Sequence, residues 1–390
     1  MKVALKNLVE IKSGYSPSTF ELMENGSIPY VKVEDMNNCT KYQSESREYC
    51  EDVDRSVPAG AIIFPKRGAA IMNNKVRITV TDICMDTNMM AIIPNGKIQS
   101  EFLYYTITHE KLSRIADTST IPQINNKHIN PYKVALPPLP EQKAIADLLS
   151  TWDEAIEKTE RLIQAKEKRL NGLFQHYFVP GRSNNIHWKK VKIGKVLKQR
   201  NKKAIPSENR PLFSLTIEDG VTPKTDRYNR EALVKDNGSK KYKIVCPDDI
   251  VFNPANLRWG AIARSKVPHE VVISPIYEVL SVKNDSVDID FISHLLTCPR
   301  QIGIYATKTE GTLIERMAVK LDAFLLLDIH LPSERGEQQK ISNILNTAQQ
   351  EIDLLKQLAE KYKTQKRGLM QKMLTGEWRV KPEVVKRYEL

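Results

Sequence analysis

Glu141-Gln-Lys-Ala-Ile-Ala-Asp-Leu-Leu149 is followed, 196 residues later, by a second copy of the same pattern, Glu337-Gln-Gln-Lys-Ile-Ser-Asn-Ile-Leu345. The register continues without a gap for roughly thirty further positions. An internal repeat of this kind indicates that one structural element occurs twice in the chain. The identical pairs are Glu141/Glu337, Gln142/Gln338, Ile145/Ile341, Leu149/Leu345, Thr151/Thr347, Ile156/Ile352, Leu162/Leu358, Gly172/Gly368, Leu173/Leu369 and Gln175/Gln371.

Each copy has the apolar spacing of one long helix. In the first copy an apolar residue recurs every seven positions on an otherwise charged stretch, which gives a seam along one face. A helix of about 37 residues is some three times the average, so packing on its own domain alone is the less favoured alternative. Because such a helix usually needs a helical partner, we expect the two copies to pair in antiparallel orientation. The residues expected at this seam are Leu149, Trp152, Ile156, Ile163 and Leu170 in the first copy and Leu345, Ile352, Leu358 and Leu369 in the second.

The segments that precede the two helices are also related. Ile62-Ile-Phe64 matches Ile250-Val-Phe252 at an offset of 188 residues, and the apolar residues near Val3 match those near Val191 at the same offset. Short alternating apolar runs between turns predict strands, with a helix starting near Phe102. We therefore predict an α/β protein: two similar globular domains separated by two long antiparallel helices, with a pseudo-twofold axis inside one chain. The predicted segments are 1–140, 141–179, 180–335, 336–376 and a tail, 377–390, whose last ten residues should fray.

Composition favours a polyanionic partner. The chain of 390 residues carries a net charge of +12, and residues 181–335 hold 26 basic against 18 acidic side chains. The chain has no apolar run of membrane-spanning length and no signal-peptide pattern at its N-terminus. Five scattered cysteines without Cys-x-x-Cys spacing fit a reducing cytoplasm and offer no zinc site.

Catalytic motifs are absent from the sequence. Neither a Walker A loop nor a Gly-x-Gly-x-x-Gly loop occurs. Asn253-Pro-Ala-Asn256 resembles the Asn-Pro-Pro-aromatic motif of amino-methyltransferases, but it lacks the second proline and the aromatic residue, so we interpret it as a turn after a buried strand. The acidic pairs Glu218-Asp219 and Asp248-Asp249 are interpreted as solvated turns. The sequence therefore predicts a reader of a polyanion with no catalytic or metal site of its own.

One family fits these features. Leu136-Pro-Pro-Leu-Pro-Glu-Gln-Lys-Ala-Ile-Ala146, leading into a long helix, resembles the repeat of type I restriction-modification specificity subunits. The second copy, Leu331-Pro-Ser-Glu-Arg-Gly-Glu-Gln-Gln-Lys-Ile341, has one inserted residue and lacks the double proline, and the resemblance covers the whole chain. It implies binding to double-stranded DNA, two methylating (M) subunits and additional restriction (R) subunits as partners, and adenine as the methylated base. S-adenosylmethionine, ATP and Mg²⁺ would then be bound by the partner subunits, with no cofactor in this chain.

The helices can be interpreted as a ruler. At about 1.5 Å per residue a helix of this length spans roughly 55 Å, whereas B-DNA repeats about every 34–36 Å. Two non-identical domains would then read the two halves of a bipartite, asymmetric site. Glu141-Gln142 and Glu337-Gln338 are interpreted as residues that satisfy free amides in the first helical turn, and we expect partner subunits to dock near the helix ends.

Candidate base-reading residues are Arg, Lys, Asn, Gln and Thr side chains in polar loops that fall at matching points of the two halves. In the first domain they are Lys66, Arg67, Asn73, Asn74, Lys75, Arg77, Thr120, Gln123, Asn125, Asn126 and Lys127. In the second they are Asn253, Asn256, Arg258, Arg264, Lys308, Thr309, Thr312 and Arg316. Trp259 is expected to pack in the core, with base stacking as the alternative. Eight basic residues between Lys189 and Lys203 form either a phosphate-facing strip or a solvated face.

Three other functions stay open at this point. The chain could be an orphan DNA-binding or regulatory protein without enzymatic partners. It could be a nuclease or methyltransferase with an unrecognised site, which the isolated chain with magnesium or S-adenosylmethionine would test. A scaffold that bridges proteins through its helices would be indifferent to DNA at low salt.

Overall fold

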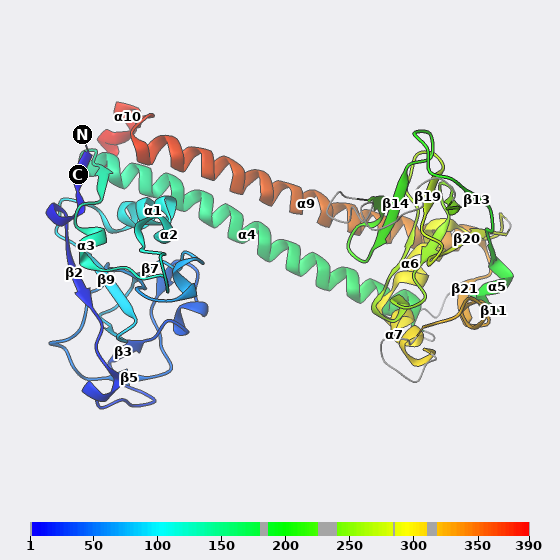
Figure 1. Cartoon of the computed structure of the whole chain (residues 1–390), viewed down its shortest axis with the longest axis horizontal. Helices are drawn as coiled ribbons and strands as arrows, with labels where there is room; N and C mark the ends of the chain where they lie inside the picture. Colours follow the sequence, from blue (N-terminus) through cyan, green and yellow to red (C-terminus); the bar gives the residue numbers. More distant parts are fainter. Residues whose placement is uncertain (1, 180–185, 225–239, 284, 310–317, 390) are drawn as a thin grey trace. The chain divides into compact units, whose positions relative to one another are not determined.

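The computed structural model of the chain describes residues 2–179, 186–224, 240–283, 285–309 and 318–389 (Figure 1). The chain forms two compact units, Met1–Arg161 with Lys356–Leu390, and Leu162–Leu355. Two long helices, α4 (Leu139–Phe178) and α9 (Arg335–Thr375), each contribute one half to each unit. Their bounds lie within two residues of the predicted helices, because the apolar spacing of a long helix is a local signal.

The first unit contains three sheets. Five strands follow the order β2 (Val9–Ser13), β9 (Met89–Pro94), β6 (Ile62–Pro65), β7 (Arg77–Thr79), β4 (Tyr42–Gln43). Three strands follow the order β5 (Tyr49–Cys50), β3 (Ile28–Val31), β8 (Cys84–Met85), and β1 (Lys2–Ala4) pairs with β10 (Lys133–Ala135). The helices outside the long pair are α1 (Ser100–Glu110), α2 (Leu112–Ile115), α3 (Asn126–Ile129) and α10 (Pro382–Val385).

Strand β6 divides the core of the first unit into two layers. Successive side chains of a strand point to opposite faces. Ile62 and Phe64 accordingly pack in the cluster that includes Leu149 of α4 and Met373 of α9, while Ile63 packs in a second cluster on the other face. Because both faces are covered, the whole run Ile62–Phe64 is apolar, and the globular domain is joined to both long helices through one continuous core.

The second unit repeats this plan with a larger second sheet. Four strands follow the order β12 (Leu197–Gln199), β20 (Glu278–Val282), β17 (Ile250–Phe252), β18 (Ile262–Arg264). Five follow the order β13 (Lys203–Ala204), β16 (Tyr242–Val245), β19 (Val271–Ile273), β14 (Leu212–Thr216), β15 (Gly220–Pro223), and β11 (Trp188–Lys192) pairs with β21 (Asp328–Pro332). The shorter helices are α5 (Ile193–Val196), α6 (Ile289–Thr297), α7 (Pro299–Thr307) and α8 (Leu321–Leu325).

Strand register confirms the duplication residue by residue. Ile62 of β6 lies opposite Ile92 of β9, and Ile250 of β17 lies opposite Leu280 of β20. Both members of the second pair follow those of the first by 188 residues, the offset predicted from the sequence. The frame of the two globular domains is therefore one fold used twice.

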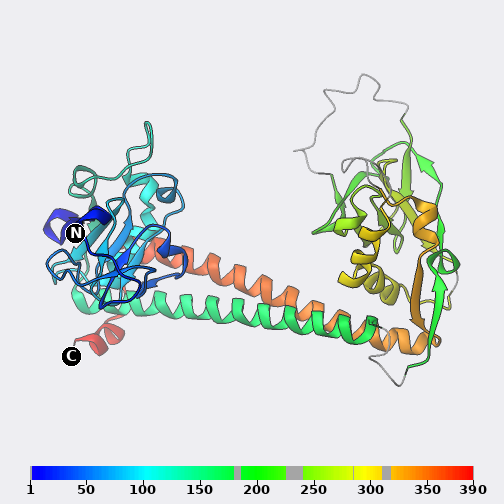
Figure 2. The ribbon, with the colours of Figure 1, turned by 90° about the horizontal axis from the view of Figure 1, so that it is seen from below.

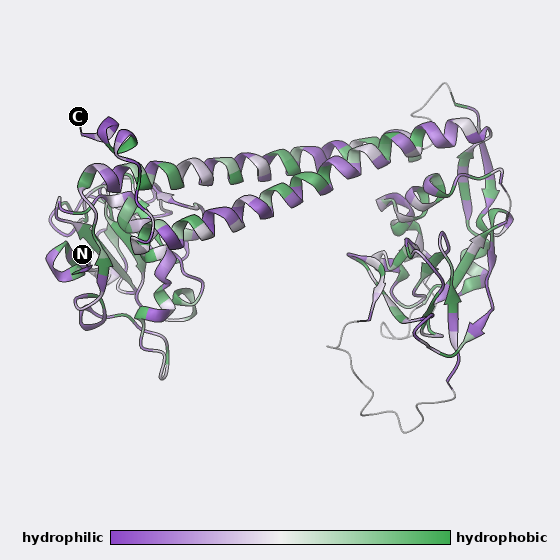
Figure 3. Cartoon of the chain, turned by 90° about the horizontal axis from the view of Figure 1, so that it is seen from above, coloured by the Kyte–Doolittle hydropathy of each residue, from purple (hydrophilic) through white to green (hydrophobic). Residues whose placement is uncertain are grey.

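The two long helices are antiparallel within each unit. In the first unit the rings of Trp152 and Tyr362 pack at 5.6 Å, Lys366 pairs with Asp153, and the Lys363 Nζ atom lies 2.9 Å from a carboxylate oxygen of Glu160. In the second, Lys166 pairs with Glu351 at 2.5 Å. Figure 3 shows hydrophobic and hydrophilic residues alternating along both helices, as expected for a paired seam with a wet outer face.

The predicted seam is confirmed at most positions and wrong at one. Leu149, Ile163 and Leu170 are buried on α4, and Leu345 and Ile352 are buried on α9, while Trp152, Ile156 and Leu369 are half-buried. Leu358, however, is 37% exposed, and its neighbour Ala359 is buried in its place. The reason is the sevenfold spacing, which leads from Leu345 and Ile352 to Ala359, one position beyond the leucine that the repeat preserves.

The tail after α9 is anchored, contrary to the predicted fraying. The Arg379 Nε atom donates to Glu141 at 2.6 Å, and the Val380 amide donates to the same carboxylate at 3.2 Å. The Tyr388 hydroxyl donates to Asp147 at 2.6 Å. Glu141 is almost fully buried by these contacts, so the acidic residue that opens the first repeat holds the end of the chain.

The repeated glutamines join the globular domains to the long helices. The Gln142 Oε1 atom accepts from the Gln99 amide at 2.8 Å, and its Nε2 atom donates to the Pro137 carbonyl at 2.9 Å. Gln338 makes the same two bonds, at 2.8 Å with Asp288 and 3.0 Å with Pro332. The expectation that these side chains satisfy amides of their own helix is therefore wrong, because their partners lie at the start of α1 or α6 and before the long helix.

Candidate nucleic-acid interface

The structure brings together the two polar loops predicted in the first domain. The Ile124 amide donates to the Lys66 carbonyl, and the Gly68 amide donates to the Pro122 carbonyl, both at 2.9 Å. Arg67 and Gln123 form an isolated antiparallel bridge between the same segments. Residues about 55 positions apart in the chain thus form one surface, which local sequence patterns do not reveal.

The second of these loops is a closed hairpin. The backbones of Asp117 and Gln123 exchange hydrogen bonds of 2.9 and 3.0 Å. The Asp117 carboxylate accepts from the Ser119 amide at 3.0 Å and from its hydroxyl at 2.7 Å, and the amide bond in particular lowers the pKa of Asp117. At the tip, Thr120 is exposed and Ile121 is 71% exposed. Figure 2 shows the hairpin projecting from the first unit on the side away from α4.

Several candidate side chains around this hairpin face solvent. Arg67 and Asn73 are exposed on one segment, and Asn125, Asn126 and Lys127 are exposed after the hairpin. Lys66 is half-buried; burial lowers the pKa of its ammonium group, and the neighbouring guanidinium of Arg67 lowers it further. A cluster of Arg, Lys and Asn side chains on one projecting surface fits both phosphate oxygens and base edges.

Other candidates in this domain are engaged with the protein itself. The Asn74 amide donates to the Thr108 carbonyl and accepts from the Leu112 amide, at 2.9 and 2.8 Å, with its backbone at φ 52°. All three guanidinium nitrogens of Arg77 donate to backbone carbonyls within 3.0 Å. Lys75 donates to the Asn37 side chain. These side chains shape the loop from within, and a role of Asn74 and Arg77 in reading bases stays a prediction.

The second domain carries the same backbone contact at its candidate loop. The Val319 amide donates to the Pro254 carbonyl at 3.0 Å, and Pro254 follows Lys66 by 188 residues. Asn256 and Lys308 are exposed, whereas the Thr309 hydroxyl donates to the Ala306 carbonyl at 3.1 Å. The Asn253 side chain accepts from the Ala255 amide at 3.1 Å, as expected for the predicted turn after a buried strand. The predicted residues Thr312 and Arg316 lie outside the described residues.

Trp259 is exposed, which corrects the expectation of core packing. Its side chain is 57% exposed, and the Arg258 guanidinium lies 4.1 Å from the ring centroid. The preceding Leu257 is fully buried and anchors a short 3-10 turn, and Gly260 ends that turn at φ 92°, a conformation that disfavours other residues. The signal available in the sequence was an aromatic residue between an arginine and a glycine in a polar loop, a setting in which aromatic rings stack on bases or sugars.

Sequence comparison places this geometry in a known family. Residues 1–167 match the family model described as the type I restriction modification DNA specificity domain. Over 333 residues the chain is 23% identical to the specificity subunit of the type I restriction enzyme MjaVIII from Methanocaldococcus jannaschii, covering 76% of this chain and 75% of that protein. Residues 1–167 therefore carry a type I restriction modification DNA specificity domain, and the chain is similar to type I specificity subunits over about three quarters of its length.

A further relative is similar to the chain in sequence, and a solved structure is similar to it in fold. Over 187 residues the chain is 27% identical to the specificity subunit of the type I restriction enzyme MjaIX from the same organism, covering 45% of this chain and 43% of that protein. Its fold is similar to the crystal structure of the S subunit of a type I restriction-modification system from M. genitalium, with a TM-score of 0.57 at 15% identity over 96% of both chains.

Two acidic features of this chain are structural. Asp249 is buried and accepts two hydrogen bonds from Arg200, at 2.7 and 2.9 Å, so it is not the solvated turn that we expected. Burial raises the pKa of Asp249, and Arg200 opposes that shift. Arg264, a predicted base reader, donates to Asp248 at 2.8 Å and also pairs with Asp290, which fixes it inside the domain. Of the predicted basic strip, Lys195, Lys198, Lys202 and Lys203 remain exposed.

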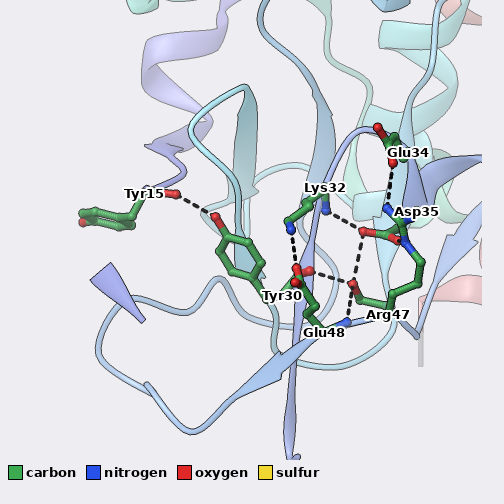
Figure 4. Close-up of polar contacts among 8 residues, drawn as sticks. Tyr15, Tyr30, Lys32, Glu34, Asp35, Arg47 and Glu48 are labelled. Carbon is green, nitrogen blue, oxygen red and sulfur yellow. Dashed lines mark hydrogen bonds and ion pairs between the residues drawn. The ribbon is translucent and has the colours of Figure 1, made fainter. Parts of the chain in front are cut away.

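A third acidic cluster lies around Asp35 (Figure 4). Asp35 is buried and accepts from the Lys32 amide and from the Arg47 Nε atom, both at 2.9 Å. Arg47 also pairs with Glu34 at 2.8 Å, and Lys32 pairs with Glu48. The carboxylates of Glu34, Asp35 and Glu48 are thus paired with basic side chains or backbone amides, as in a network that stabilises the fold. Within the described ranges, no group of three or more His, Cys, Asp or Glu side chains could hold a metal ion, and no helix is long and apolar enough to cross a membrane.

Proposed function

We propose that the chain is the DNA sequence-specificity subunit of a type I restriction-modification complex and binds a bipartite, asymmetric DNA site. The observation that carries this proposal is the shared backbone contact, Lys66 with Ile124 and Pro254 with Val319, which presents a polar loop in both domains. By similarity to type I specificity subunits, we infer that both loops contact DNA. Their different side chains would give each domain its own half-site.

The two candidate surfaces differ in chemistry. The first presents Arg67, Asn126 and an exposed Ile121, and the second presents Asn256 and the stacked Arg258–Trp259 pair. Arg recognises guanine, Asn recognises adenine, and apolar side chains contact the thymine methyl group. A domain pair built on one frame but with different loop residues is suited to a site whose halves have different sequences.

Two methylating subunits and further restriction subunits are the partners that we propose. Leu148 and Ile344 occupy the same position of the two repeats and are 37% and 42% exposed. Leu162 and Leu358 are a second such pair and are likewise exposed. Large apolar residues exposed at matching repeat positions favour a partner that docks once on each repeat. S-adenosylmethionine, ATP and Mg²⁺ would be bound by these partners in the cytoplasm, and this chain itself would be non-catalytic.

Methylation mapping tests the proposal directly. The chain is co-produced with the methylating subunit of its host, and modified adenines are located in genomic DNA. We expect methylation at a single bipartite sequence that disappears when this chain is omitted. Oligonucleotides with altered gap lengths would test the predicted spacing of the half-sites. Methylation without sequence preference, or methylation that is independent of this chain, would contradict the proposal.

Arg67→Ala and Trp259→Ala separate the contributions of the two domains. Because one good base contact contributes about 1–3 kcal/mol, we expect each variant to lower methylation roughly 10- to 100-fold. Arg67→Ala should relax sequence preference in one half of the site only, and Trp259→Ala should affect the other half only. Arg114→Ala, an exposed arginine of α2 in the first unit, serves as the control. Equal effects of both variants on the same half-site would refute the assignment of one domain to each half.

A further inference from the structure

The same place on the two repeats is filled in one unit and open in the other. In the first unit the rings of Trp152 and Tyr362 pack against each other, with centroids 5.6 Å apart and planes at 75°. The residues that correspond to them in the repeat register, 196 positions away, are Ala348 for Trp152 and Lys166 for Tyr362. The second unit therefore replaces two rings with a methyl group and a flexible chain.

An open groove lies at that place in the second unit. It has a volume of about 520 Å³ and is lined by Lys166, Arg169 and Leu173 of α4 and by Ile344, Ala348 and Glu351 of α9. Ile344 is the exposed apolar residue that matches Leu148 in the first repeat. A groove of this size is within the range of about 300–1,000 Å³ that is typical of sites for small molecules and side chains.

The charges at the rim indicate what surrounds the occupant. Glu351 is paired with Lys166 at 2.5 Å, and Arg169 adds an exposed positive charge beside them. Lys168, the residue before Arg169 on α4, is also exposed. An apolar floor with a positive rim is complementary to an aromatic side chain that has carboxylates next to it.

We infer that this groove receives an aromatic side chain, flanked by acidic residues, from a methylating subunit. The inference rests on the proposed function. The occupant is argued from the first unit, where the same positions are filled by a Trp and a Tyr, so the helix spacing at this point suits aromatic rings. In the second unit a partner would supply the aromatic ring that the first unit supplies from its own chain.

In the first unit the matching place is filled by side chains of the chain itself. Its two rings occupy the place, and the Tyr388 hydroxyl bonds to Asp147 at 2.6 Å, where the second unit has Asn343 beside its groove. The two docking positions are therefore unequal. The methylating subunit that docks on the second unit carries an anchor that the other one lacks, so it binds more tightly and dissociates last.

Grafting the filling of the first unit into the second tests this inference. The double variant Ala348→Trp with Lys166→Tyr closes the groove with the two side chains found at the matching place of the first unit. Native mass spectrometry and titration with purified methylating subunit then measure stoichiometry and affinity. We expect the tighter of two binding steps to weaken at least 10-fold and the weaker step to remain. Gln350→Trp, which adds the same side chain at an exposed position of α9, is the matched control and should leave both steps unchanged.

A charge reversal tests the rim without filling the groove. We expect Arg169→Glu to weaken the tighter step several-fold and to remove part of its salt dependence, while Lys168→Glu has a smaller effect. Two steps of unaltered affinity in the groove-filled variant would overturn the inference, as would equal weakening of both steps. If the unmodified chain binds no methylating subunit at all, the proposed function fails instead, which is a separate result.

Discussion

Around Tyr105, the joint between globular domain and helix pair is built from charged groups in the first unit, whereas the matching place in the second unit holds neutral groups. In the first unit Lys41 is buried and donates to the Tyr105 hydroxyl at 3.0 Å and to Ser150 at 3.2 Å. Tyr105 in turn donates to Asp153 at 2.6 Å, and Lys366 of α9 pairs with the same carboxylate. This network links one strand-bearing loop, α1 and both long helices.

In the second unit a histidine occupies the place of Tyr105. His294 follows Tyr105 by 189 residues, and its Nε2 atom lies 2.7 Å from the Oδ1 atom of Asn346, which matches Ser150 in the repeat. Phe174 packs beside it at 6.0 Å between ring centroids. The difference shows that the duplicated frame is fixed elsewhere, by the backbone bonds of Gln142 and Gln338. The side chains around those bonds differ between the copies: they are ionic around Tyr105 in the first unit and neutral around His294 in the second.

The largest expected effect comes from breaking the ionic joint. Asp153→Ala removes the carboxylate shared by Tyr105 and Lys366, whose ammonium group is largely buried, and leaves the buried Lys41 with Glu101 of α1, 3.4 Å away, as its acidic partner. Removing one partner of a buried ion pair costs about 3–5 kcal/mol, and since Asp153 is partly exposed we expect about 3 kcal/mol. Chemical denaturation measures the free energy of unfolding. Asn346→Ala, the matched change in the second unit, should cost only about 1 kcal/mol, because it removes one neutral hydrogen bond. Similar costs for the two variants would remove the contrast between the joints.

The shared glutamines should have the next largest effect, and it should be equal in the two units. Gln142→Ala and Gln338→Ala each leave buried backbone groups without partners, which costs about 2 kcal/mol. Hydrogen exchange of the Gln99 and Asp288 amides should accelerate in the respective variant. Gln365→Ala, at an exposed position of α9, is the control and should change neither. An effect confined to one unit would show that the frame is not fixed in the same way twice.

The smallest expected effect is a pH dependence confined to the second joint. Burial lowers the pKa of His294 from its ordinary value of 6.5; Asn346 and Asp290 oppose the shift, and Lys266 and Arg264 add to it. Because the folded-state pKa is the lower one, the unfolded chain takes up the proton first as pH falls below about 6.5. The free energy of unfolding of the second unit should therefore decrease between pH 7.5 and 5.5.

His294→Gln keeps a hydrogen-bonding side chain and reduces this slope, while His330, whose pKa burial also lowers, accounts for the part that remains. Denaturation of both proteins at the two pH values provides the measurement, and the difference should stay near 1 kcal/mol or below. An unchanged slope in the variant would assign the pH dependence to other groups.

The sequence predicted the duplicated architecture because its signals are local. Repeated identities at a fixed offset and a sevenfold apolar spacing do not depend on what the chain contacts elsewhere. Leu358 shows the limit, because identity between the copies suggested burial where the spacing favours Ala359.

The sequence indicated which loops contain residue types that can bind DNA. It did not indicate which of those side chains are instead bound to other parts of the protein. Arg77 donates to carbonyls at Met36 and Val76 and at Cys39, and Arg264 pairs with Asp290, so distant segments decide which cations remain available for DNA. Trp259 was expected in the core because it is a large aromatic residue, whereas Leu257 takes the buried position of that turn. Neither outcome can be read from neighbouring residues alone.

The anchored tail has a topological consequence. Lys2 of the first strand and Arg379 of the tail line one cavity of about 220 Å³, together with Glu141 at the start of the first repeat. The first strand and the segment after α9 therefore lie side by side. Because these two segments are close, the order of the two halves along the chain could be exchanged without moving either of them. A circularly permuted gene that joins these ends with a short linker and opens ahead of Trp188 should yield a protein with every joint described above intact.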